Sequence, residues 1–309
     1  MACPYRQKGV LMITNIPSHT TFSKTALSFL NLAWESALEL AVSLDEAKKY
    51  DSDVPEDDYW SACQTQLATA ISLVQQASEF LLKSRIAEVS PYLLIGGTPK
   101  VWPKECNKEH LPFADFFMIE AQELVKAHDT VAAVRLPEGV KTRFEEMRRL
   151  RNGIMHTVDE RLKVEVKQVA VAILEISDWF VGPKKWIGIR REHMENSPNS
   201  LAYSSDGAPY LLAREIMKTV EMLTSSDNKR LLGFSTKQRR YICPGCASRC
   251  GDFGLKPNVA LLRPNAATST TLHCYLCGED ILVVRERCNK PGCKGNVLDE
   301  DGCCLTCYH

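Results

Sequence analysis

The distribution of cysteines limits most strongly how this chain can fold. Of 13 cysteines in 309 residues, ten lie between residue 243 and residue 309. Eight of those ten form four closely spaced pairs, CPGC, CYLC, CNKPGC and CLTC. Paired thiolates at such spacing are the usual ligands of tetrahedral zinc, and four of them close its coordination shell. The segment is therefore predicted to fold around metal, because it is too small to hold a core without it.

The four pairs divide into two similar halves, which predicts two structural zinc ions and no catalytic metal. The first predicted ligand set is Cys243, Cys246, Cys274 and Cys277, and the second is Cys288, Cys293, Cys304 and Cys307. An interleaved arrangement, in which the first pair joins the third and the second joins the fourth, is the alternative. Disulfides are a further alternative, which a reducing compartment disfavours.

The choice within the last pair rests on spacing. Cys304 is preferred to Cys303 because it restores a two-residue gap to Cys307. Other potential ligands in this segment are Cys250, His273, Cys303 and His309. Residues 270–277 and 280–286 read as short strands, so the halves are expected to be two small β zinc ribbons.

The rest of the chain has the pattern of helices. Apolar residues recur at intervals of three and four over residues 25–49 and 55–89, and helices are also predicted at 112–131, 137–150, 159–180 and 210–224. With 45% hydrophobic and 25% charged residues, the chain can hold one sizeable core and a smaller module. The predicted fold is mainly α, an antiparallel helical bundle followed by small β zinc ribbons.

Three regions are expected from this pattern. Residues 1–181 form the helical domain, residues 182–240 a basic linker with a short helix, and residues 241–309 the two ribbons. Residues 186–210 lack periodicity and are rich in serine, asparagine, glycine and proline, which favours a linker. No apolar run is long enough for a signal peptide core or a membrane span, so a cytoplasmic protein is expected, with no membrane partner.

The formal net charge is zero, with 38 basic and 38 acidic residues, so no general attraction to nucleic acid is expected. Residues 240–309 are also nearly balanced, with 8 basic and 7 acidic side chains. The basic runs at 184–191 and 228–240 are the better candidates for contact with an RNA backbone. Solvated surface is the alternative interpretation of such runs.

The segment RRLRNGIMHTVDE, residues 148–160, contains residue types suited to cleaving RNA without metal. The imidazole of His156 could move a proton to or from a ribose oxygen, and Arg151 could stabilise a pentavalent phosphorane. Asn152 would orient one of these groups or the substrate. Thr157 and Glu160 match a capping box, which predicts a helix end and a bend between Arg151 and His156. An ordinary solvated helix end is the alternative.

One histidine cannot easily act as base and acid on opposite faces of a phosphorus atom. A two-fold homodimer that faces two such segments would supply two arginines and two histidines to one cleft. In a single continuous helix, five residues of rotation would place Arg151 and His156 about 140° apart, poorly arranged to share a ligand.

RNGIMH resembles the RNxxxH form of the R-x4-6-H motif of HEPN domains, an all-α family. Residues 77–97, ASEFLLKSRIAEVSPYLLIGG, are similar to the second-helix region of such domains, and the likeness covers roughly residues 20–181. The resemblance implies a metal-independent endoribonuclease with a composite site at a homodimer interface. It implies that Arg151 stabilises the transition state, His156 acts as acid or base, and Asn152 supports them.

The same resemblance implies a prokaryotic toxin or antiviral setting and a product with a 2′,3′-cyclic phosphate. Active relatives often carry tyrosine two residues after the histidine, where this chain has Val158. Other relatives are inactive or only bind. The second hypothesis is accordingly a non-catalytic dimeric adaptor whose zinc ribbons bind nucleic acid or a regulatory protein.

Overall fold

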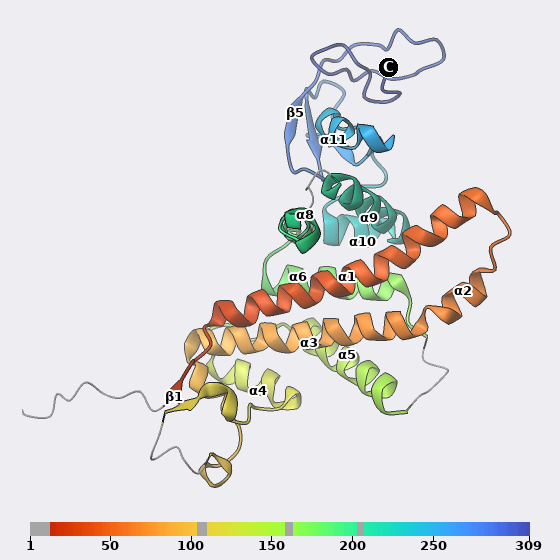
Figure 1. Ribbon diagram of the computed structural model, residues 1–309. Helices are drawn as coiled ribbons and strands as arrows, with labels where there is room; N and C mark the ends of the chain where they lie inside the picture. Colours follow the sequence, from red (N-terminus) through yellow and green to blue (C-terminus); the bar gives the residue numbers. More distant parts are fainter. Residues whose placement is uncertain (1–12, 104–109, 158–162, 203–206) are drawn as a thin grey trace, which may run out of the picture. The chain divides into compact units, whose positions relative to one another are not determined.

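A computed structural model describes residues 13–103, 110–157, 163–202 and 207–309 (Figure 1). The chain is mainly helical, and its small antiparallel strands lie near the C-terminus beside the cysteine clusters. The predicted fold class is therefore confirmed. Within these ranges, no helix combines the length and the apolar character that crossing a membrane requires.

The chain divides into two compact units. The first comprises Met1–Leu30 and Ser72–Asp159, and the second comprises Asn31–Ile71 and Glu160–His309. Helices α1 (His19–Tyr50) and α3 (Gln64–Val89) contribute to both. The second unit therefore contains both cysteine clusters and also parts of two long helices.

Helix α1 follows the predicted apolar stripe and begins earlier than expected. Leu30, Trp34 and Leu38 are fully buried at intervals of four residues, the spacing that keeps side chains on one helix face. The helix starts at His19 because Ser18 precedes it and its hydroxyl accepts a backbone N–H from the first turn at 3.2 Å.

The helix predicted at 55–89 is observed as α2 (Glu56–Ala62) and α3, interrupted only at Cys63. Helical hydrogen bonding continues across the interruption, since Cys63 N–H donates to Tyr59 O and its carbonyl accepts from Leu67 N–H, both at 3.0 Å. The 3₁₀ segments Pro91–Leu94 (η1) and Pro99–Val101 (η2) follow α3.

The helix predicted at 112–131 begins only with α4 (Ala121–Val131). Its expected first turns are instead strand β2 (Leu111–Pro112), paired in parallel with β1 (Ile13–Thr14), and a 3₁₀ turn, η4 (Phe113–Asp115). Helix α4 can start there because the Glu123 carboxylate accepts the backbone N–H of Glu120 at 3.3 Å.

Helices α5 (Glu138–Thr157) and α6 (Val166–Phe180) complete the predicted helical region. Helix α5 runs seven residues past the predicted end at Leu150. Helix α6 starts where the Gln168 side chain accepts the backbone N–H of Glu165 at 2.9 Å.

The predicted linker at 186–210 is wrong over most of its described length. Residues there form α7 (Trp186–Glu195) and α8 (Pro198–Ala202), and α9 (Ala208–Met222) follows. Trp186 and Arg190 are fully buried one helical turn apart on α7. An apolar-periodicity test does not count arginine as a core residue, so it misses this helix. Helix α10 (Ser225–Asp227) and the π-helical turn η5 (Asn228–Leu232) come next.

The C-terminal part begins with α11 (Pro244–Arg249) and the 3₁₀ turn η6 (Gly251–Phe253). A three-stranded antiparallel sheet follows in the order β3 (Ala260–Leu262), β4 (Thr271–Cys274), β5 (Asp280–Leu282). The predicted strands at 270–277 and 280–286 correspond to β4 and β5. The second half is joined by isolated bridges, Val284 to Leu298 and Leu298 to Cys304.

Candidate functional site

The first cysteine cluster is assembled from a helix start and a strand hairpin. Cys243 caps the N-terminus of α11 and Cys246 lies in its first turn, while Cys274 ends β4 and Cys277 lies in the turn before β5. The Sγ atoms of Cys243 and Cys277 are 3.9 Å apart, and those of Cys246 and Cys274 are 3.7 Å apart. All four sulfurs lie within 4.8 Å of one another.

The second cluster is assembled from loops around an isolated bridge. Its members are Cys288, Cys293, Cys304 and Cys307, and their sulfurs also lie within 4.8 Å of one another. The Sγ separations are 3.8 Å for Cys288 and Cys307, and 3.9 Å for Cys293 and Cys304. The structure thus groups the cysteines in the two predicted sets. Each half is self-contained, so the interleaved alternative is wrong.

The cysteine and histidine alternatives lie outside these clusters. Cys304, not Cys303, belongs to the second group. Cys250 is fully buried but joins neither group, and His273 contacts Asp280 through Nδ1 at 2.6 Å.

The sulfur spacing can be compared with what a metal requires. With Zn–S bonds of about 2.3 Å, a regular tetrahedron places neighbouring sulfurs roughly 3.8 Å apart. The four measured separations run from 3.7 to 3.9 Å. A disulfide needs about 2.05 Å, so these thiols are free and unbridged. Each cluster therefore could bind one metal ion with four sulfur ligands.

Backbone N–H groups point at several of the sulfurs. The N–H of Cys246 donates to Cys243 Sγ at 3.5 Å, and the N–H of Gly295 donates to Cys293 Sγ at 3.3 Å. Burial raises the pKa of Cys304, but hydrogen bonds from the backbone N–H groups of Cys307 and Thr306, together with those of the Cys288 and Cys307 side chains, lower it to about 7. Such donors favour the thiolate, which is the form that binds metal.

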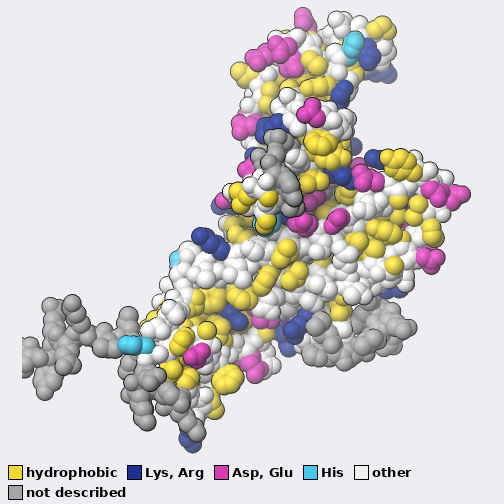
Figure 2. Space-filling model, viewed as in Figure 1, with side chains coloured by type: hydrophobic (Ala, Val, Ile, Leu, Met, Phe, Trp, Pro, Cys, Tyr) yellow, Lys and Arg dark blue, Asp and Glu magenta, His cyan; other side chains and the backbone are white. Residues whose placement is uncertain are grey.

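The surface around the clusters carries charges of both signs. On the face drawn in Figure 2, basic and acidic side chains are interspersed over the C-terminal modules. This arrangement agrees with the near balance of 8 basic and 7 acidic residues in 240–309. The face gives no single-sign surface for nucleic acid.

The Arg151 segment lies on α5 in the first unit. The predicted bend is wrong, because α5 is continuous through Thr157 and places the backbone of Arg151, Asn152 and His156 in one helix. The positions of Arg151 and His156 are therefore about 140° apart around the helix axis. The predicted capping partner Glu160 and Val158 lie outside the described residues. The side chain of His156 also lies outside them.

Arg151 and Asn152 contact each other directly. The Arg151 guanidinium donates from Nη1 to Asn152 Oδ1 at 3.2 Å, and both side chains are half-buried. The nearby carboxylates pair with other arginines. Glu145 accepts a hydrogen bond from Arg148 at 2.9 Å, and Glu146 accepts one from Arg143 at 3.0 Å. Asn152 thus supplies a side-chain acceptor to Arg151.

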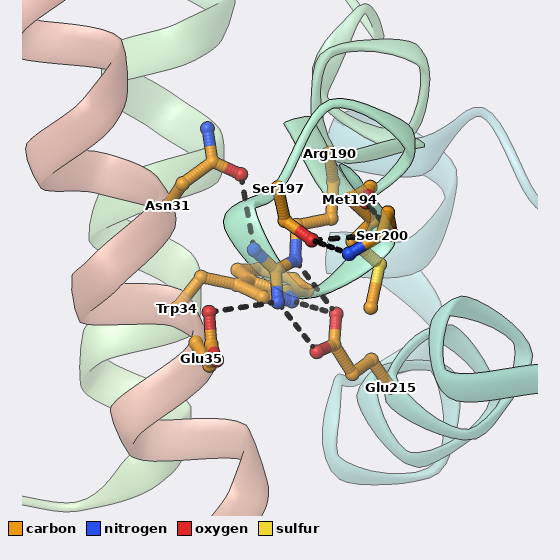
Figure 3. A network of polar contacts seen from close by, with 8 residues as sticks. All are labelled: Asn31, Trp34, Glu35, Arg190, Met194, Ser197, Ser200 and Glu215. Atoms are coloured by element: carbon orange, nitrogen blue, oxygen red, sulfur yellow. Dashed lines mark hydrogen bonds and ion pairs between the residues drawn. The ribbon is translucent and has the colours of Figure 1, made fainter. Parts of the chain in front are cut away.

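Arg190 belongs to the basic run at 184–191, which was predicted as a candidate for RNA contact or as solvated surface, but it lies in the core of the second unit. Figure 3 shows Arg190 of α7 between α1 and α9. Its Nε and Nη2 donate to the Glu215 carboxylate at 3.0 and 2.9 Å, and Nη1 donates to Asn31 at 3.3 Å. Trp34 Nε1 donates to the same carboxylate at 2.9 Å. Arg190 therefore cannot contact RNA, and sequence spacing gave no signal for this partnership.

Comparison with known proteins returned no matching family model, no curated relative and no solved structure. The chemistry of the residues is therefore the basis for any functional assignment.

Proposed function

We propose that each cysteine cluster holds one structural zinc ion. The observation that carries this proposal is the grouping of four sulfurs within 4.8 Å in each cluster, where two pairs are 3.7 to 3.9 Å apart, close to the edge of a zinc tetrahedron. A second support is the small core of the second module, whose buried cluster is Cys288, Leu298 and Cys304. Since two of those three are ligands, metal would supply the stability that apolar burial does not.

Metal content tests the zinc proposal. Native mass spectrometry should find two zinc ions per chain, and one in each of the variants Cys274→Ser and Cys304→Ser. The controls are Cys250→Ser and Cys303→Ser, which remove neighbouring cysteines outside the clusters and should keep two. Two ions in Cys304→Ser, or one in Cys303→Ser, would contradict the ligand assignment.

We propose further that the first unit, which contains α5, is a metal-independent endoribonuclease. The observation that carries this proposal is the contact between the side chains of Arg151 and Asn152 on α5. The same helix carries His156, five residues after Arg151. A histidine would remove the proton from a ribose 2′-hydroxyl, whose oxygen attacks the adjacent phosphorus. Arg151 would stabilise the charge of the phosphorane, and a second histidine would protonate the leaving 5′-oxygen. The products are a 2′,3′-cyclic phosphate and a 5′-hydroxyl.

The continuity of α5 makes a second copy of the chain necessary to this mechanism. Positions about 140° apart on one helix do not present both groups to one phosphate. Two α5 helices related by a two-fold axis would let Arg151 of one copy act with His156 of the other. The proposed enzyme is therefore active as a homodimer.

A mixing experiment tests both the residues and the dimer. The variants Arg151→Ala and His156→Ala should each fail to cleave single-stranded RNA during a short exposure to EDTA. Wild-type protein mixed with an excess of His156→Ala should, after subunit exchange, lose more activity than dilution explains, because each heterodimer carries only one of the two histidines that the mechanism uses. Arg149→Ala, which removes an exposed arginine two positions away on α5, is the matched control and should stay active.

The competing function is a non-catalytic adaptor that binds nucleic acid or protein. Wild-type protein that binds RNA but leaves it intact, in the presence or absence of cell extract, would favour the adaptor. Cleavage that survives His156→Ala would refute the proposed chemistry.

A further inference from the structure

The second unit contains a basic cavity on the first zinc module. It lies between the start of α7 and strand β4, and its volume is about 450 Å³. Lys184, Lys185 and Arg191 line it from the helical side, and Arg263, His273 and Tyr275 line it from the sheet side. Four permanent cations thus converge on one hollow in a chain whose formal net charge is zero.

Neighbouring carboxylates balance the charges of this cavity only in part. No acidic residue lines it, and among residues 163–202 and 207–309 none forms an ion pair with the four cations. Two carboxylates lie close by: Asp178 accepts the backbone N–H of Lys184 at 2.8 Å, and an Asp280 oxygen is 2.6 Å from His273 Nδ1. Zinc held by four thiolates has a net charge of about −2, which offsets part of the positive charge. The four cations still exceed the combined negative charge of that centre and of Asp178.

Two of the cations are held in fixed positions. Arg191 Nη1 donates to the carbonyl of Cys277 at 2.8 Å, and Arg263 Nη2 donates to the Tyr275 hydroxyl at 2.9 Å. The Arg263 guanidinium also lies 5.1 Å from the centre of the Tyr275 ring. Each guanidinium keeps further N–H donors for a ligand. Because the side chains are already ordered, binding an anion costs less conformational entropy.

The aromatic ring in the cavity indicates which part of a nucleic acid is recognised. Tyr275 contacts Arg263 over its face, and the rings of Phe234 and His273 meet it edge-to-face at 5.3 and 4.9 Å. A ring so occupied offers little surface for stacking a base, whereas base-binding sites need free aromatic faces. The cavity therefore favours phosphate over base.

We propose that this cavity binds the phosphate backbone of single-stranded RNA without base preference. The choice of RNA rests on the proposed ribonuclease function, while the preference for phosphate rests on the cavity itself. Lys184 and Lys185 would act as mobile point charges, and Arg191 and Arg263 as oriented donors. The zinc module would thus supply substrate affinity and α5 the chemistry.

Binding is measured on the inactive His156→Ala protein, so that it is separated from cleavage. Fluorescence anisotropy with oligouridine and oligoadenosine should give affinities within about threefold of each other. If all four cations contact phosphate, the slope of log K against log salt should be about −3, from roughly −0.7 per contact. Adding Lys184→Glu and Lys185→Glu should halve that slope and weaken binding at low salt by at least about tenfold.

Matched variants control for effects of net charge and of misfolding. Lys24→Glu with Lys49→Glu makes the same change in net charge at exposed positions on α1 and should leave the salt slope unchanged. Arg263→Gln is a second cavity variant, and circular dichroism confirms that each protein folds. Inorganic phosphate or a mononucleotide at equal phosphate concentration should compete weakly, since each fills only part of the cavity.

The outcomes separate this proposal from the ribonuclease. Unchanged binding in both cavity variants, strong base preference, or tighter binding of mononucleotide than of the strand would overturn the cavity proposal. Loss of binding in the cavity variants would support it even if the wild type proves unable to cleave RNA. If the wild type cleaves RNA and the cavity variants bind RNA with full affinity, the ribonuclease proposal is supported and the cavity proposal is refuted.

Discussion

The buried Arg190 to Glu215 pair provides a quantitative test of how the second unit is held together. Arg190 is 1% exposed, and Glu215 accepts three hydrogen bonds, two from Arg190 and one from Trp34. Burial opposes the charge on Arg190, but the contacts with Glu215 raise the pKa of its guanidinium above the ordinary value. The change Glu215→Gln leaves that charge inside the protein without its principal partner.

The magnitude follows from what remains around Arg190. Asn31 accepts at 3.3 Å and Glu35 lies at 3.5 Å, but the Glu35 side chain is 55% exposed and compensates poorly. Breaking a buried ion pair costs about 3–5 kcal/mol, and the residual partners favour the lower end, about 3 kcal/mol. For a unit of this size, about 2–4 °C per kcal/mol predicts a fall in Tm of roughly 6–12 °C.

The assay is thermal unfolding of the zinc-loaded protein followed by circular dichroism. Glu46→Gln is the matched control, because Glu46 of α1 also pairs with an arginine in the second unit, Arg214 of α9, at 2.7 Å, but is 46% exposed. That exposed pair should contribute at most about 1 kcal/mol. The double variant Arg190→Met, Glu215→Gln removes both charges and keeps an acceptor for Trp34, so it should be more stable than Glu215→Gln alone. Equal losses for Glu215→Gln and Glu46→Gln would refute the reasoning.

Three further predictions concern single side chains. Gly295→Ala should weaken zinc binding at the second cluster in a competitive chelator titration, because an added Cβ would collide with Cys304 Sγ; unchanged affinity would contradict this geometry. Hydrogen bonds from Lys141, the Leu136 backbone and His128 lower the pKa of Asp129 from 3.8 to about 2 against the effect of burial. The stabilisation is present above pH 4 and is lost as the pH falls toward 2, so Asp129→Asn should flatten that part of a stability profile measured with urea. Ser18→Ala should cost about 1 kcal/mol by removing the cap of α1, and a loss below about 0.3 kcal/mol in urea unfolding would mean that the cap is dispensable.

Local patterns predicted the cysteine clusters well. The spacing of Cys243 to Cys246 and of Cys304 to Cys307 matches the reach of a knuckle around one ion, so the members of each cluster could be chosen correctly from the chain alone. The stripe of Leu30, Trp34 and Leu38 likewise predicted α1, because burial on one helix face imposes that interval. In both cases the constraint acts between residues that are close in sequence.

In the α5 segment, local sequence patterns gave a wrong prediction of secondary structure. The capping pattern at Thr157 predicts a bend between Arg151 and His156, yet α5 runs unbroken through Gly153 to its end at Thr157. Cap and glycine propensities amount to about 1 kcal/mol each, which packing of an apolar helix face readily exceeds. Val140, Phe144 and Met147 are buried along that helix and anchor it. The consequence for the proposed chemistry is a requirement for two copies of the chain.

By itself, the sequence determined the mainly helical architecture, the two separate cysteine clusters and which cysteines form each of them. Only the tertiary structure decided that α7 is part of the second unit, that Arg190 is buried, and that Lys184 and Arg263 share one cavity. The physical reason is the range of the interactions. Helix periodicity and metal knuckles act over a few residues, whereas the partners Arg190 and Glu215 are 25 residues apart and are matched only when the helices pack.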